Sequence, residues 1–92
     1  MHDAQITQLY IKFTQRKQEI LTLLCDGWSN AEIAQRLFIA SSVVAGHLTE
    51  IYAEIGNLDA SAQRQITRHV AVAIFAPFFE RHPDLRASIR TS

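Results

Sequence analysis

The sequence predicts an all-α fold built around two short helices joined by a tight turn. Apolar residues recur at helical spacings of three and four along most of the chain, and no segment shows the alternation with a period of two that strands require. The chain has 92 residues, of which 48% are hydrophobic and 20% are charged. That composition is too apolar for a disordered segment, and the length suits one small core. We therefore expect residues 1–92 to form a single helical domain.

Residues 3–13 predict an amphipathic N-terminal helix. Its apolar residues, at relative positions i, i+3, i+4 and i+7, are Ile6, Leu9, Tyr10 and Phe13. We expect this helix to cover apolar surface of the rest of the domain, and a linker or dimerisation helix is the alternative.

The core is expected to span residues 14–56 and to begin with a helix that Thr14 caps. Its buried face comprises Ile20, Leu21 and Leu24. Gly27 follows at its end, where glycine readily adopts the left-handed conformation that terminates helices.

Residues 29–55 predict a helix-turn-helix unit. Ser29 and Glu32 have the spacing of a capping box, which predicts the start of the first helix. The apolar residues of that helix are Ile33, Ala34 and Leu37, and those of the second are Val44, Leu48, Ile51 and Ile55. Two short helices that share a core through a turn form a unit whose second helix, here about residues 41–55, usually enters the DNA major groove.

A further helix is expected over residues 59–76, with Asp59 or Ser61 as its cap. Its predicted buried stripe consists of Ala62, Ile66, Val70 and Ala73. Pro77 should end this helix, because proline lacks the backbone donor and clashes with the preceding turn. Residues 77–92 then form a C-terminal extension, with a turn over 78–83 and a loose helical turn over 84–90.

Several large apolar residues on and after this helix are too many for one helix end to bury. Either the N-terminal helix covers them, or a second subunit or protein partner does. The candidates for such an interface are Ile66, Val70, Val72, Phe75, Phe78 and Phe79.

The residues from Phe13 to Asn57, about half of the chain, resemble the LuxR-type (GerE-type, NarL-type) helix-turn-helix domain. The resemblance is carried by Phe13-Thr14-x-Arg16, by Gly27-x-Ser29-Asn30-x-Glu32-Ile33-Ala34-x-x-Leu37-x-Ile39 and by Val44-x-x-His47-Leu48-x-x-Ile51-Tyr52-x-x-Ile55-Gly56. It implies a four-helix DNA-binding domain, here with an extra N-terminal helix and a C-terminal extension. It also implies that the third core helix reads DNA and that the fourth, 59–76, commonly forms the dimer.

On this resemblance, the DNA contacts are expected at Arg16, Asn30, Arg36, Ser41, Ser42, Val43, Ala45, Gly46, His47 and Thr49. Arg16 and Arg36 suit phosphate contacts, whereas Ser42 and Thr49 offer hydrogen bonds and Ala45 suits a thymine methyl group. Gly46 costs a helix about 1 kcal/mol relative to alanine, a cost that close approach of another backbone would offset.

The chain departs from the family where the family touches DNA. The family usually has lysine where this chain has Ala31 and Ala45, and often where it has Glu54. It usually has serine or threonine where this chain has Ala40 and Val43. Residues 13–56 contain three cations and five anions, and the whole chain has a net charge of zero. Because phosphate neutralisation supplies much of DNA affinity, a second hypothesis remains open. In it, the fold serves protein–protein interaction, as an antagonist or adaptor of a transcription factor.

The sequence favours a protein that is not an enzyme and needs no metal or cofactor. Cys25 is the only cysteine, and the histidines lack the spacing of metal ligands. Spacing alone leaves a nucleophilic Cys25–His47 pair open, but no other motif supports it. No apolar run is long enough to span a membrane and the N-terminus does not resemble a signal peptide, so a cytoplasmic location is expected.

Overall fold

The computed structural model of the chain describes residues 2–58 and 66–89. All regular structure in these two stretches is helical, which confirms the predicted all-α class. The elements in chain order are α1 (Asp3–Lys12), α2 (Gln15–Cys25), α3 (Asn30–Leu37), α4 (Ser41–Leu58), α5 (Arg68–Arg81) and the short 3₁₀ helix η1 (Pro83–Leu85). None of the described helices is long and apolar enough to cross a lipid bilayer.

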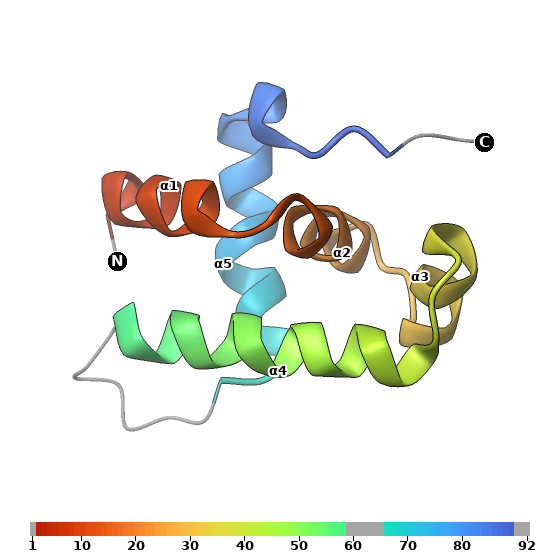
Figure 1. Ribbon diagram of the computed structural model, residues 1–92. Coiled ribbons are helices and arrows are strands. Elements are labelled where there is room, and N and C mark those ends of the chain that lie inside the picture. Colours follow the sequence, from red (N-terminus) through yellow and green to blue (C-terminus); the bar gives the residue numbers. More distant parts are fainter. Residues whose placement is uncertain (1, 59–65, 90–92) are drawn as a thin grey trace.

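Helix α4 forms one side of the molecule, and the other helices pack against it (Figure 1). Helices α1 and α2 follow one another in a layer above α4, α5 crosses behind this layer, and α3 closes the end where α4 begins. Each of these four helices contacts α4. One long face of α4 is therefore turned inward along its whole length, and the opposite face is open.

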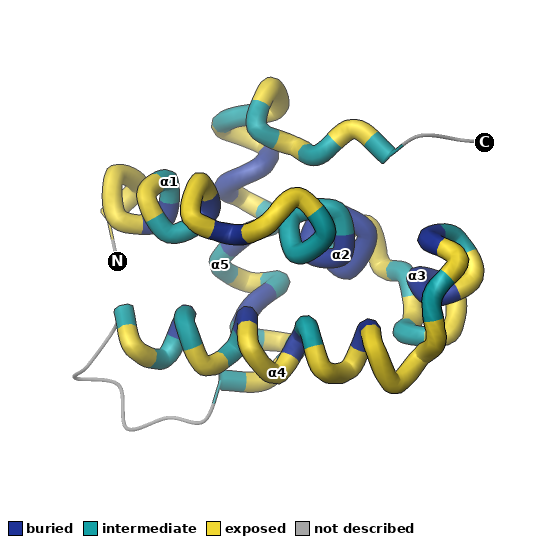
Figure 2. Tube along the Cα trace, in the orientation of Figure 1, coloured by how far each residue is buried: buried dark blue, intermediate teal, exposed yellow. Residues whose placement is uncertain are grey.

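The inward face of α4 is the apolar stripe that its sequence predicts. Val44, Leu48, Ile51 and Ile55 are all buried. Figure 2 shows the buried segments of α4 on the side that faces the other helices. The buried apolar residues that α2 and α3 add to this core include Ile20, Leu21, Leu24, Ile33, Ala34 and Leu37. Burial of a single side chain of this size stabilises the fold by about 1.5–3 kcal/mol, so these stripes fix how the helices dock.

The predicted caps of α2 and α3 are present. The Thr14 hydroxyl accepts a hydrogen bond from the Lys17 backbone N–H at 3.3 Å. The Ser29 hydroxyl accepts from the Glu32 N–H at 3.2 Å, and the Glu32 carboxylate accepts from the Ser29 N–H at 2.9 Å. These two bonds complete the capping box, and the bond from the Ser29 backbone is the main reason that the pKa of Glu32 lies below its usual value. Gly27 follows α2 with φ of 94°, the left-handed conformation that the sequence predicts.

Helix α1 covers an aromatic cluster on α5, as expected for the N-terminal helix. The Tyr10 ring centroid lies 6.2, 6.0 and 5.4 Å from those of Phe75, Phe78 and Phe79. The three phenylalanines are 0, 0 and 2% exposed. Their assignment to a dimer or partner interface is therefore wrong, because α1 of the same chain already occupies their surface.

Helix α5 differs from the helix expected over 59–76. Residues 59–65, which include the expected caps Asp59 and Ser61 and stripe residue Ala62, lie outside the described residues. Within the described part the helix begins at Arg68, where the Thr67 hydroxyl caps it by accepting from the Val70 N–H at 3.4 Å. Ile66 therefore lies before the helix.

The buried stripe of α5 also differs from the predicted one. Ala71, Phe75, Phe78 and Phe79 are buried, whereas Val70 is half-buried and Ala73 is exposed. The helix rotates so that the large aromatic rings face the core, because they remove much more apolar area from water than valine or alanine does.

Pro77 lies inside α5 and does not end it, and residues 78–81 are helical where a turn was expected. An interior proline costs a helix about 3 kcal/mol, because the carbonyl four residues earlier loses its donor. That carbonyl belongs to Ala73, and both Ala73 and Pro77 are exposed, so water can reach this side of the helix. Continuation of the helix brings Phe78 and Phe79 onto the core, which offsets the cost.

The C-terminal segment after α5 packs along α2. It forms one 3₁₀ turn at Pro83–Leu85 where a loose turn over 84–90 was expected, and it then continues without regular structure. The Arg86 guanidinium donates to both carboxylate oxygens of Asp26, at 2.9 and 2.7 Å. The Ala87 N–H donates to the hydroxyl of the buried Thr22 at 3.2 Å, and that hydroxyl donates to the carbonyl of Gln18 at 2.8 Å. The extension is thus attached to the core.

Candidate nucleic-acid interface

The structure contains the predicted helix-turn-helix unit, formed by α3, a three-residue turn and α4. Phe38 ends α3 in the left-handed conformation, with φ of 58° and ψ of 43°. The next residue, Ile39, donates its N–H to the carbonyl of Ala34 at 3.0 Å, which closes the turn. A left-handed residue other than glycine costs roughly 1–2 kcal/mol, so the turn is held by the packing of the two helices that it joins.

The open face of α4 gathers most of the residues that the resemblance assigns to DNA. Six of them are exposed on the first half of this helix, and these are Ser41, Ser42, Val43, Ala45, Gly46 and Thr49. Val43 is a large apolar residue with 45% of its surface exposed. His47 differs from the six, because it is half-buried and its Nδ1 is enclosed without a hydrogen-bond partner among the described residues.

Gly46 lies near the middle of this open face. A methyl group placed on its Cα would meet no atom within 4 Å, apart from its chain neighbours and the helix's own backbone. No described segment of the chain therefore makes the close approach that would explain a glycine at this point.

Two cations near the start of α2 are paired, and one of the two pairs reaches α4. Arg16, which the sequence analysis named, lies 3.3 Å from Glu19 on the same helix. Lys17 lies 2.8 Å from the Glu50 carboxylate of α4, and its hydrogen bond is the main cause of a lowered pKa for Glu50. Sequence reasoning missed the pair of Lys17 and Glu50, because only the docking of α2 on α4 brings them together.

Asn30 and Arg36 contact the C-terminal part of the chain. The side-chain oxygen of Asn30 accepts from the Arg68 guanidinium at 3.3 Å, and Arg68 also donates to the carbonyl of Trp28. The Arg36 guanidinium donates to the carbonyl of Ile89 at 3.5 Å. The structure thus separates these two candidates from the six on α4 and gives Arg68 a structural role that the sequence did not reveal.

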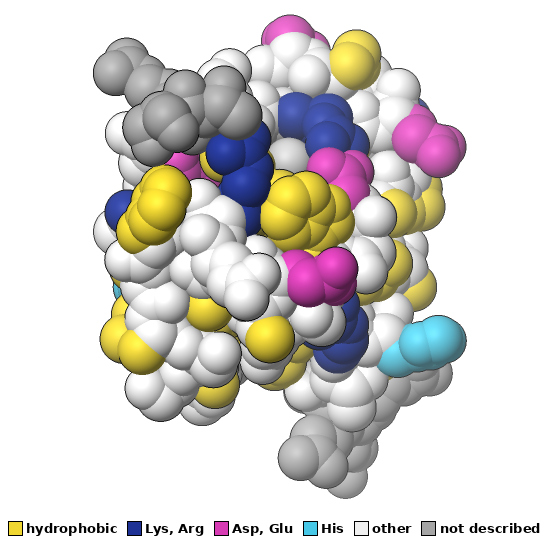
Figure 3. Space-filling model, turned by 90° about the vertical axis from the view of Figure 1, so that its right-hand side faces the viewer, with side chains coloured by type: hydrophobic (Ala, Val, Ile, Leu, Met, Phe, Trp, Pro, Cys, Tyr) yellow, Lys and Arg dark blue, Asp and Glu magenta, His cyan; other side chains and the backbone are white. Residues whose placement is uncertain are grey.

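Figure 3 shows the side of the molecule that carries α3 and the C-terminal segment. Acidic and basic side chains are intermixed there around a hydrophobic patch, so this face has no continuous positive surface. A shallow cavity of about 310 Å³ is lined on it by Trp28, Glu32, Gln35 and Arg36.

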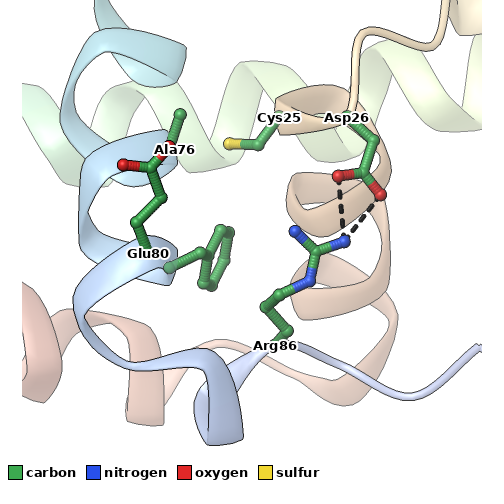
Figure 4. A pocket seen from close by; sticks show the side chains of 6 residues that line it. Cys25, Asp26, Ala76, Glu80 and Arg86 are labelled. Carbon is green, nitrogen blue, oxygen red and sulfur yellow. Dashed lines mark hydrogen bonds and ion pairs between the residues drawn. The ribbon is translucent and has the colours of Figure 1, made fainter.

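A second cavity, of about 300 Å³, lies between α2, α5 and the C-terminal segment (Figure 4). Its lining includes the thiol of Cys25 and the paired Arg86 and Asp26. Burial is the main cause that raises the pKa of Cys25 to about 12, so the thiol stays protonated at neutral pH and is unsuited to act as a nucleophile. The described residues also include no group of three or more His, Cys, Asp or Glu that could hold a metal ion.

Residues 12–69 match the luxR family of bacterial regulatory proteins, also called GerE. The chain belongs to this family. The match covers α2, α3 and α4 and ends at the start of α5, so α1, most of α5 and the C-terminal segment lie outside it. The luxR family comprises transcription regulators with a helix-turn-helix domain and is not an enzyme class.

Curated relatives support the family assignment. A protein of Mycobacterium tuberculosis named as an HTH-type transcriptional regulator is 40% identical over 43 residues, which are 47% of this chain and 5% of that protein. The transcriptional regulatory protein YhcZ of Bacillus subtilis is 35% identical over 54 residues, 59% of this chain and 25% of YhcZ. The oxygen regulatory protein NreC of Staphylococcus aureus is 36% identical over 53 residues, 58% of this chain and 24% of NreC. The chain therefore spans a quarter or less of the length of these relatives. No solved structure shows a significant match to it.

Proposed function

We propose that the protein regulates transcription in the cytoplasm by binding double-stranded DNA, with the first half of α4 in the major groove. One observation carries the proposal: within a luxR-family helix-turn-helix, the face of α4 opposite its buried stripe is exposed over residues 41–49. A helix is narrow enough to enter the major groove, and the second helix of this motif is the one that does so.

The charges around α4 predict an unusual kind of DNA binding. Arg16, the expected phosphate contact on α2, is paired with Glu19, and Lys17 of α2 is paired with Glu50 of α4. If both of these cations contact phosphates, the logarithm of the affinity should fall with the logarithm of salt with a slope of about −2 per domain. This dependence is much weaker than that of proteins that make many phosphate contacts.

A matched pair of variants tests the proposed face. Ala45 and Ala73 are both exposed on helices, but only Ala45 lies on the open face of α4. Ala45→Glu should weaken binding to a duplex by about tenfold or more, because it brings a carboxylate toward the phosphates. Ala73→Glu should leave the affinity nearly unchanged.

Fluorescence anisotropy with a labelled duplex measures both variants, and circular dichroism checks that they fold. Equal affinities for the two variants would exclude α4 as the DNA-binding helix. If the unmodified protein binds no duplex even at about 50 mM salt, the proposal fails, and the alternative role in protein–protein interaction takes its place.

Dimerisation through α5 remains part of the proposal, with a smaller interface than the sequence suggests. Ile66, Val70 and Val72 are half-buried and can still contact a second copy, whereas the phenylalanines cannot. Sedimentation equilibrium of the protein and of Val70→Asp tests this interface. A monomer at the highest soluble concentration would exclude it.

A further inference from the structure

The open face of α4 offers methyl groups where DNA-reading helices usually offer long polar side chains. Residues 41–49 include no Arg, Lys, Asn or Gln, the side chains that make paired hydrogen bonds to guanine and adenine. Val43 is the large apolar residue exposed in this segment, with 45% of the residue exposed. The exposed Ala45 adds a methyl group on the other edge of the same face.

Thr49 adds to this apolar character despite its hydroxyl. The hydroxyl donates to the carbonyl of Ala45, one turn earlier in the same helix, at 3.0 Å. Its proton is therefore used inside α4, and the methyl group of the exposed side chain remains for contacts outside the helix. Thr49 and Ala45 are four residues apart, so their methyl groups are neighbours on the helix surface.

Gly46 lies near the middle of the open face of α4, between Val43 on one edge of that face and Ala45 on the other. Because a side chain is absent at this position and no other described segment lies near it, the backbone of α4 can approach the base pairs closely. Close approach is what weak apolar contacts need, since dispersion forces act only at van der Waals distance.

We propose that α4 selects its DNA site through the C5 methyl groups of pyrimidines in the major groove, with Val43, Ala45 and Thr49 as the contacting residues. This inference rests on the proposed function. The C5 methyl group of thymine is the apolar group that the standard base pairs expose in the major groove, and 5-methylcytosine carries the same group at the same position. Thymine is the ligand that the proposal expects.

Replacement of thymine by deoxyuridine tests this directly, because it removes the methyl group and leaves all base-pairing groups in place. The probe is a duplex selected from a random pool by the purified protein, with single thymines replaced in turn. Each contacted methyl should change Kd by about fourfold, the value expected for burial of one such group. A second series replaces cytosines of the same duplex by 5-methylcytosine.

Two conservative variants of Thr49 identify the group on the protein side. Thr49→Ser keeps the hydroxyl and removes the methyl, so it should weaken binding and lose the response to deoxyuridine at one position. Thr49→Val keeps a methyl and removes the hydroxyl, so it should retain both. The opposite order would show that Thr49 reads DNA by hydrogen bonding and would overturn its assigned role.

The outcomes separate this inference from the proposed function. A loss of affinity with deoxyuridine supports thymine as the ligand. A gain with 5-methylcytosine and no loss with deoxyuridine overturns thymine and assigns the methyl group to methylated cytosine. Binding that neither substitution changes overturns methyl recognition while DNA binding stands, and absence of binding to any duplex overturns both.

Discussion

Gly46→Ala is expected to stabilise the folded protein and at the same time to weaken its binding to DNA. Glycine inside a helix is less favourable than alanine by about 0.8–1 kcal/mol, because it loses more backbone entropy on folding. The added methyl group would meet no atom beyond its neighbours and the helix's own backbone within 4 Å, so no steric cost reduces the gain. For a domain of this size the gain corresponds to a rise in Tm of about 4–8 °C.

The effect on DNA should have the opposite sign. Gly46 is central on the exposed face that we propose enters the groove, so an extra methyl would hold α4 away from the bases. Overpacking of this kind costs about 1–3 kcal/mol, and we expect a loss of affinity of about tenfold.

Gly56→Ala is the matched control. Gly56 also lies in α4, and a methyl group there would reach ordinary contact with the Ile66 side chain, 3.5 Å away. This variant should not weaken DNA binding. Urea unfolding followed by circular dichroism, together with anisotropy titrations, measures both properties. A lower unfolding free energy for Gly46→Ala would refute the steric reasoning, and an unchanged affinity for DNA would refute the close approach of α4.

Four further variants test other contacts. Glu50→Gln removes the carboxylate that competes with a phosphate for Lys17, so the affinity for DNA should rise severalfold. Thr22→Val removes a buried hydroxyl that bonds two backbone groups, and should lower the unfolding free energy by about 1–3 kcal/mol in urea titrations. Pro77→Ala restores a helical N–H and should raise Tm. Hydrogen bonds from Arg81, and then from His82, lower the pKa of Asp3 below its usual value of 3.8. The stabilisation that these bonds give to the folded protein is therefore present above pH 3.8 and is lost as the pH falls through the lowered pKa. Asp3→Asn should therefore flatten the acid limb of a plot of stability against pH.

These predictions fail in distinct ways. An unchanged affinity for Glu50→Gln would show that Lys17 does not reach a phosphate. An unchanged unfolding free energy for Thr22→Val would mean that the hydrogen bond between the C-terminal segment and Thr22 contributes little to stability. A lower Tm for Pro77→Ala would show that proline stabilises this helix more than alanine does. If the loss of stability at low pH is the same in Asp3→Asn, protonation of Asp3 does not contribute to acid unfolding.

Local rules predicted the helix-turn-helix unit well. The capping box of Ser29 and Glu32 and the stripe from Val44 to Ile55 depend only on hydrogen bonds and spacing within a few residues. Both are present as predicted, because neighbouring residues alone decide them.

Features that depend on packing between helices could not be predicted in the same way. The helix-breaking tendency of proline predicts that the helix ends at Pro77. The helix continues because the burial of Phe78 and Phe79 against α1 stabilises the fold by more than the proline costs. The pair of Lys17 and Glu50 joins residues 33 positions apart, and the Thr49 hydroxyl bond is visible only in coordinates. Sequence reasoning listed the residues of the open face, and the structure adds the side-chain directions on which their chemistry depends.

The salt dependence of duplex binding tests the central claim most directly. We claim that α4 is open for DNA while Arg16 and Lys17, the two cations assigned to phosphates, are each paired with a carboxylate. Between about 50 and 200 mM salt, the affinity of one domain should therefore fall by only about tenfold. A fall of a thousandfold or more would contradict the claim, since it would require many more phosphate contacts than these two cations can make. A complete lack of binding at the lower concentration would contradict it as well.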